Sequence, residues 1–184
     1  MELKLNALVI VFVVASGATS AQQGGDEQRA AMARLDWLVG DWEGSGWIDR
    51  GSGRSEFFST ERVRRAAGGA VITIEGVHHS KTGQTRAAVV HDAFAVISFD
   101  PQSRGYRFAS HLSTGQSGAF DMVASEREFA WRLPIGDKGE RGRVEYSAKL
   151  DADGRWVETG RFCPPQGECR PPSFHMELTR RNKP

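Results

Sequence analysis

The sequence lacks the features that would identify a nucleic-acid or nucleotide partner. Its 24 basic and 23 acidic residues leave a net charge of +1, whereas nucleic-acid-binding domains normally carry a strong basic excess or a basic stripe. The basic pairs Arg64-Arg65 and Arg180-Arg181 are too short to form one, so we interpret them as solvated charge. No glycine-rich loop opens a helix, so a phosphate-binding loop and a dinucleotide fingerprint are both missing.

Long apolar segments are also missing. The longest apolar run, residues 7–15, is shorter than the about 20 residues that a membrane span needs. It follows Lys4 and precedes a stretch of small residues that ends at Ala21, which is the order typical of a secretory signal peptide. We therefore predict a signal peptide over residues 1–21, a linker over 22–25 and a single domain over 26–184. The protein is then expected to be periplasmic or secreted.

Cysteine is scarce, with only Cys163 and Cys169 at the ends of the loop CPPQGEC. In an oxidising compartment two cysteines this close are expected to pair. Closing so short a loop stabilises a fold by roughly 2–3 kcal/mol. A metal or redox pair is the alternative, but zinc needs two further ligands and no cysteine remains to supply them. We predict a structural disulfide that holds a hairpin tip.

One helix and about ten strands are predicted. Ala31, Leu35 and Leu38 recur on one helical face within residues 26–38. From Trp42 onward, short segments rich in β-branched and aromatic residues alternate with turns that contain Gly, Asp or Pro. The predicted strands cover residues 42–50, 54–66, 70–79, 85–92, 93–99, 104–112, 116–124, 127–134, 141–150, 155–162 and 173–181. There are ten if residues 85–99 form one long bent strand.

This pattern favours an all-β fold. Antiparallel strands joined by short turns hide their edges by closing into a barrel or by stacking as a sandwich. Strand–helix–strand alternation is missing, which excludes a parallel α/β sheet. No repeat occurs at the period of propeller blades or solenoids.

The segment LDWLVGDWEGSGWI, residues 35–48, sets three tryptophans among three glycines. If it opens the first strand of a closed barrel, one face of that strand carries Trp42, Gly44, Gly46 and Ile48. Glycines here would let the strand coil sharply or let another backbone approach. Trp42 would then plug one end of the barrel, with Trp37 beside it.

The pattern Gly40-x-Trp42-x-Gly44-x-Gly46 is similar to the signature that opens the nitrobindin-like haem-binding barrels, and its first part is similar to the lipocalin opening. The whole segment resembles an exported family of lipocalin-like barrel domains, mostly of unknown function. Two later segments fit that family, namely Phe99-Asp100-Pro101 with Tyr106, and Leu178-Thr179-Arg180. The resemblance implies a calycin-type, antiparallel up-and-down closed β-barrel of about ten strands with one short N-terminal helix.

Nitrobindin-like barrels bind haem through a histidine near the closing strand, and the resemblance implies His175 as the matching residue here. Phe174, Met176 and Leu178 form the apolar face of that strand. A dry core would place His175 outward, whereas a roomy and partly polar cavity could place it inward. Haem or gas binding through His175 is therefore an alternative function.

Other catalytic or metal sites are not predicted. His78 and His79 are adjacent on a strand and point to opposite faces, so they cannot both join His91 around one ion. The serines lie in no strand–turn–helix elbow, and residues 115–118 are one residue short of that motif. The carboxylates are scattered along strands and turns. We therefore do not expect an enzyme.

The remaining interpretation is binding, since a barrel of this strand number can hold one small ligand in its interior. The candidate lining residues are Trp42, Phe108, Tyr146, His175 and Met176, with Arg107 or His175 to anchor a polar head group. We expect non-catalytic binding of a small hydrophobic or amphipathic molecule, with no resident cofactor. A structural or interaction protein of the cell envelope is the second alternative, and it predicts a filled barrel.

Overall fold

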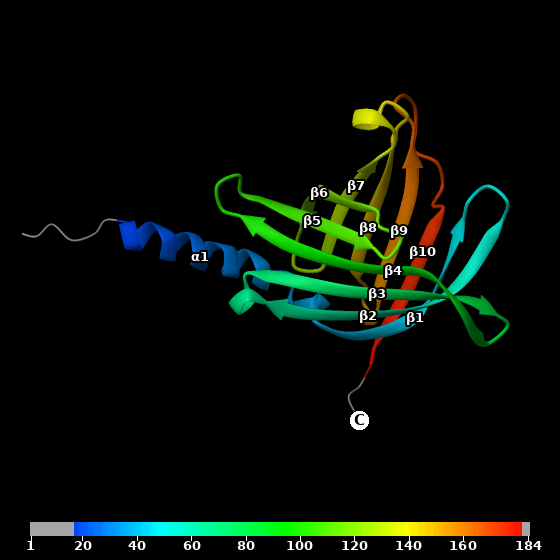
Figure 1. The fold of residues 1–184 in the computed structure, drawn as a ribbon, viewed down its shortest axis with the longest axis horizontal. Helices are drawn as coiled ribbons and strands as arrows, with labels where there is room; N and C mark the ends of the chain where they lie inside the picture. The colour runs from blue at the N-terminus through cyan, green and yellow to red at the C-terminus, as the bar shows by residue number, and fades with distance from the viewer. Residues whose placement is uncertain (1–16, 182–184) are drawn as a thin grey trace, which may run out of the picture.

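The barrel wall consists of ten antiparallel strands that follow one another around a closed sheet (Figure 1). The computed structural model describes residues 17–181, with side chains from residue 24 onward. The strand order is β1-β10-β9-β8-β7-β6-β5-β4-β3-β2, so β10 closes the ring against β1. The predicted up-and-down closed barrel is confirmed, and the sandwich is excluded.

The strand predictions hold to within a few residues at the ends. The strands are β1 (Gly40–Asp49), β2 (Arg54–Ala66), β3 (Val71–Thr82), β4 (Thr85–Asp100), β5 (Gly105–Leu112), β6 (Ser117–Ala124), β7 (Glu128–Pro134), β8 (Arg143–Leu150), β9 (Trp156–Cys163) and β10 (Phe174–Arg180). The two segments predicted within residues 85–99 form the single strand β4.

The N-terminal helix differs from its prediction. Helix α1 spans Gly17–Ala33 and therefore includes residues 22–25, which were expected to be a linker. The alanines and glutamines of α1 as a whole favour helix, which offsets the two glycines at residues 24 and 25. The helix also ends before Leu38, and a separate 3-10 turn follows at Asp36–Leu38. Residues 1–16, most of the predicted signal peptide, lie outside the described residues.

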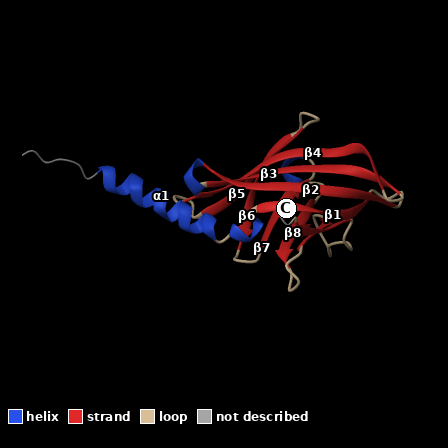
Figure 2. Cartoon of the chain, turned by 90° about the horizontal axis from the view of Figure 1, so that it is seen from below, coloured by secondary structure: helices blue, strands red, loops and turns tan. Residues whose placement is uncertain are grey.

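Figures 1 and 2 show that most of α1 projects away from the barrel and that only its C-terminal end meets it. None of the described helices combines the length and the apolarity needed to cross a membrane.

Tryptophans and aliphatic side chains close the barrel end nearest α1. Trp42 on β1 and Trp156 on β9 are almost fully buried, with ring centroids 5.9 Å apart in an edge-to-face arrangement. Trp37, on the 3-10 turn, packs on the same Trp156 ring at 6.2 Å. The aliphatic residues buried with them are Met32, Leu35 and Leu38. The predicted positions of Trp42 and Trp37 at one barrel end are confirmed.

The glycines of β1 allow the closing strand to approach. A Cβ atom at Gly44 would overlap the carbonyl oxygen of Glu177 and would lie 3.0 Å from the Cα of Leu178. A Cβ atom at Gly46 would overlap the carbonyl oxygen of His175. Both contacts are with the backbone of β10, so the predicted close approach of another backbone is confirmed.

Candidate functional site

The barrel contains a cavity of about 650 Å³ on the side of the tryptophan plug away from α1. Its walls come from all ten strands, and its floor includes Phe129 and Trp156. Most of the lining is apolar, and its aromatic members are Phe57, Phe108, Phe120, Phe129, Trp131, Tyr146, Trp156 and Phe174. A cavity of this size and lining is typical of small-molecule sites.

One wall is a stack of aromatic rings. Trp131 on β7 lies parallel to Tyr146 on β8 with centroids 4.2 Å apart, and its ring is 4.8 Å from Phe108 on β5. Alternation along the strands brings these rings to the inner face. Burial, and then the nearby charge of Glu158, raise the pKa of Tyr146 to about 12, so its hydroxyl stays neutral at physiological pH.

Polar side chains gather on the wall formed by β2, β3 and β4. The Glu61 Oε1 atom accepts a hydrogen bond from Ser59 Oγ at 3.1 Å and lies 3.2 Å from Nε2 of His78. The His78 ring stacks on Phe57 at 4.5 Å and lies 4.7 Å from the ring of His91. Burial, and then repulsion by His78, lower the pKa of His91, so this imidazole is neutral at pH 7.

Glu158 on β9 is the second carboxyl group in the cavity. Burial, and then the negative charge of Glu61, raise its pKa to about 8. The Trp156 N–H lies close enough to lower this pKa by a smaller amount. It does not complete a hydrogen bond, however, and has no partner among the described residues. Glu158 is therefore largely protonated at pH 7.

Several predicted lining residues meet in the cavity. Phe108, Tyr146 and Met176 all line it. Trp42 does not, because it lies in the plug, where its indole N–H donates to the Leu38 carbonyl oxygen at 2.7 Å. The role of Trp42 is therefore to close the barrel beneath the cavity.

His175 and Arg107 face outward, contrary to the roles considered for them. On β10, Met176 and Leu178 are buried, so alternation directs His175 to the outer surface. There its Nε2 atom lies 3.0 Å from Glu177 Oε1, and its ring stacks on Trp47 at 6.0 Å. An outward imidazole cannot ligate a haem inside the barrel, so this residue does not fit that role. Arg107 is likewise exposed and pairs with Asp121 at 2.9 Å.

Sequence reasoning missed Glu61 and Glu158, and it considered His78 and His91 only as metal ligands, not as lining of a cavity. The period of two on β2 contained a signal, because Glu61 shares a face with the apolar residues Phe57 and Val63. The pairing of His78 with His91 depends on the β3–β4 register, which shifts directly after His78. That register could not be read from the sequence.

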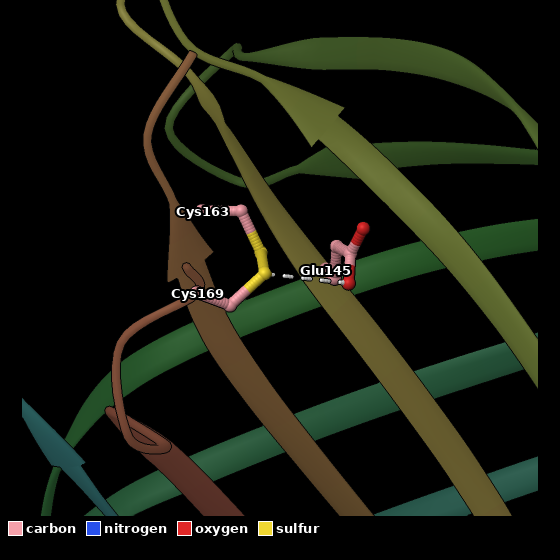
Figure 3. A group of neighbouring side chains, drawn as sticks. All are labelled: Glu145, Cys163 and Cys169. Atoms are coloured by element: carbon pink, nitrogen blue, oxygen red, sulfur yellow. Dashed lines mark hydrogen bonds between the residues drawn. A yellow bond between two sulfur atoms is a disulfide. The ribbon is translucent and has the colours of Figure 1, made fainter. Parts of the chain in front are cut away.

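Cys163 and Cys169 form the predicted disulfide between the end of β9 and the loop that leads to β10 (Figure 3). Glu145 lies beside it, with its Oε2 atom 4.0 Å from the Cys169 sulfur. These three residues are the one group of possible metal ligands that comes together in the described part of the chain. Because the two sulfur atoms are bonded to each other, we interpret the group as structural.

Fold and site together define a closed up-and-down β-barrel with an aromatic interior cavity. No family model matches the sequence, and no curated protein matches it. Among solved structures, the fold is similar to that of Rv2717c from M. tuberculosis, with a TM-score of 0.59 and 11% sequence identity. The match covers 83% of this chain and 98% of that chain. At this level of identity the similarity concerns the fold alone.

Proposed function

We propose that this protein binds a small hydrophobic or amphipathic molecule inside its barrel and does not transform it. The observation that supports this proposal is the cavity of about 650 Å³ with its aromatic walls. Transfer of apolar ligand surface from water to such walls is favourable, at about 25 cal/mol per Å². A few polar groups at one side would orient the molecule.

The alternatives receive less support. Haem binding through His175 would need an inward imidazole, and that ring stacks on Trp47 at the outer surface. A purely structural envelope protein would have a filled barrel, and the cavity argues against one. We also propose that the protein works outside the cytoplasm, because the Cys163–Cys169 disulfide is of a kind that persists in oxidising compartments.

Native mass spectrometry with an absorbance scan tests the proposal on the full chain expressed in an exporting host. A bound mass of lipid or metabolite size is the expected result, together with a loss of residues 1–21 and of two hydrogens. A bound haem with its Soret band would instead support the haem alternative. A protein that binds no apolar probe in any condition would contradict the proposal.

A cavity-filling substitution provides a second test. Ala95 is buried on the inner face of β4 and lines the cavity, so Ala95→Phe should reduce binding of an apolar fluorescent probe at least about tenfold. Ala109 lies on β5 and is not among the lining residues, so Ala109→Phe is the matched control. Equal probe affinity in the two variants would place the binding site outside the barrel.

A further inference from the structure

The deep part of the cavity contains two carboxyl groups and, among the described residues, no lysine or arginine; the imidazole of His78, 3.2 Å from Glu61 Oε1, is the one basic group in contact with them. Glu61 and Glu158 both line it, close enough for the charge of one to raise the pKa of the other. Arg50 is the only arginine or lysine among its described lining residues, and it is exposed, just beyond the end of β1. Buried carboxylates without a cationic partner are unfavourable and are concentrated at functional sites.

We infer that the ligand carries a cationic nitrogen, as an amine or a quaternary ammonium group, and that this nitrogen lies against Glu61 and Glu158 while the apolar part contacts the aromatic wall. This inference rests on the proposed function and specifies the chemical class of its ligand.

The surroundings of Glu61 leave one of its oxygens available. Its side chain is only 7% exposed, and both of its contacts, with Ser59 Oγ and His78 Nε2, use Oε1. No described residue donates a hydrogen bond to Oε2. That oxygen lies over Gly76, where a Cβ atom would overlap it. The glycine therefore leaves space for a carboxylate whose Oε1 is hydrogen-bonded and whose Oε2 has no donor among the described residues.

Glu158 and its neighbour Trp156 lie close together but do not complete a hydrogen bond with each other, and no described side chain forms an ion pair with Glu158. The Trp156 ring is 2% exposed, yet its N–H has no acceptor among the described residues. Buried polar groups in native proteins are nearly always satisfied, so the unpaired Trp156 N–H at the cavity wall is a group that a bound molecule can satisfy.

Aromatic faces complete the cation site. Trp131, Tyr146 and Trp156 line the same cavity as the two carboxyl groups, and Trp and Tyr rings attract cations through their negative faces. An anionic head group would instead meet the carboxyl groups of Glu61 and Glu158, and the deep part of the cavity offers it only the imidazoles of His78 and His91 and no lysine or arginine among the described residues. The cavity therefore favours a cationic amphiphile over a fatty acid.

Competition against an apolar fluorescent dye, N-phenyl-1-naphthylamine, tests the inference. The competitors are decyltrimethylammonium, decanol and decanoate, which share one chain length and differ in charge; the two ionic compounds are used below their micelle-forming concentrations and decanol below its solubility limit. We expect decyltrimethylammonium to displace the dye at a concentration at least about tenfold lower than decanol, and decanoate to be the weakest. Equal affinities, or a preference for decanoate, would overturn the inference while dye binding still supports the proposed function. Failure of the dye and of all three competitors to bind would contradict the proposed function itself.

Isosteric variants separate charge from shape. At pH 9, where Glu158 is ionised, Glu61→Gln and Glu158→Gln should each remove most of the preference for the ammonium compound and leave the decanol affinity within about twofold, which also verifies the fold. Glu75→Gln, on the exposed face of β3, is the matched control and should leave the preference unchanged. If both interior variants keep the wild-type preference, the carboxylates do not contact the cation.

The same preference should increase between pH 7 and pH 9, because the pKa of Glu158 is about 8 and its carboxyl gains its charge in this interval. The other titratable groups that line the cavity are Glu61 on β2, His78 on β3, His91 on β4, Tyr146 on β8 and, beyond the end of β1, Arg50. The quaternary probe does not titrate, and a preference that is constant or falls over this range would overturn the assignment of Glu158.

Discussion

Glu158 shows how strongly a barrel interior can change the chemistry of one side chain. Its carboxyl group ordinarily titrates at a pKa of 4.5, and burial together with the charge of Glu61 raises that pKa to about 8. The ionised form loses its hydration in the cavity and gains no cationic partner among the described residues. The free energy of unfolding of the unliganded protein is therefore lowered by an amount that depends on pH.

We predict that Glu158→Gln stabilises the unliganded protein progressively as the pH rises. Below pH 4.5 the folded and unfolded states both hold the proton. Between pH 4.5 and about 8 only the folded state keeps it, so wild-type stability falls through this window and changes no further above it. The gain should approach roughly 2–4 kcal/mol at pH 9. Urea unfolding at pH 4 and pH 9 measures it, with Glu75→Gln as control, and a gain that is the same at both values would contradict the prediction.

At Gly44 the space available for a side chain, and not its charge, determines the stability of the fold. We predict that Gly44→Ala destabilises the protein by at least about 2 kcal/mol, because the new methyl group would meet the backbone of β10 at Glu177 and Leu178. Gly105→Ala is the matched control, since its Cβ atom would meet only Ser103 at 3.5 Å. Chemical denaturation of both variants measures the difference, and similar losses would mean that β1 can move away from β10.

At the scale of elements, the β9–β10 connection is the one joined by a covalent crosslink. Cys163 ends β9, and Cys169 lies six residues later in the loop. Arg170 in that loop donates its N–H to the Phe162 carbonyl oxygen at 2.8 Å, so the loop folds back against the end of β9. The disulfide thus fixes the approach to the strand that closes the barrel.

We predict that the double variant Cys163→Ala, Cys169→Ala loses roughly 2–3 kcal/mol of stability, because its unfolded chain is less constrained. A reductant should lower the denaturation midpoint of the wild type to about that of the double variant. The midpoint of the double variant itself should not change when the reductant is added. A wild type insensitive to a reductant that demonstrably cleaves the bond would contradict this account.

At the scale of the whole molecule, Arg180 joins the last strand to the N-terminal segment. Its guanidinium donates to the carbonyl oxygen of Trp37 at 2.7 Å and to that of Val39, and it lies 4.3 Å from the centre of the Trp42 ring. The Tyr106 hydroxyl adds a hydrogen bond of 2.8 Å to the Ala31 carbonyl oxygen at the end of α1. Barrel closure and plug formation are therefore coupled.

We predict that Arg180→Lys lowers stability by about 1–2 kcal/mol, because an ammonium group cannot reproduce the planar fork that reaches two carbonyl groups and covers a ring. Arg181→Lys is the matched control, because Arg181 is exposed and its side chain pairs with Glu43 at 3.3 Å. Its effect should stay within about 0.5 kcal/mol. Thermal unfolding of the two variants measures the difference, and equal shifts would show that Arg180 acts only as a surface charge.

The sequence alone determined the strands, the disulfide and the tryptophan plug, because each depends on local information. Alternation with a period of two, turn residues and cysteine spacing can each be recognised from a few neighbouring residues. The plug residues Trp37 and Trp42 likewise lie in one short segment, residues 35–48. The ends of the helix were predicted less well from the sequence, since the residues before Asp26 are helical as well.

Tertiary structure alone decided what lies inside the cavity. His78 meets His91 through the β3–β4 register, and Glu61 approaches Glu158 across strands that are about a hundred residues apart in sequence. A cavity also relaxes the rule that only apolar side chains face inward, so polar residues on β2 and β9 could not be assigned to a face by pattern. The outward position of His175 followed from alternation along β10, where Met176 and Leu178 face inward. Function in this barrel therefore depends on contacts that exist only once the ring of strands has closed.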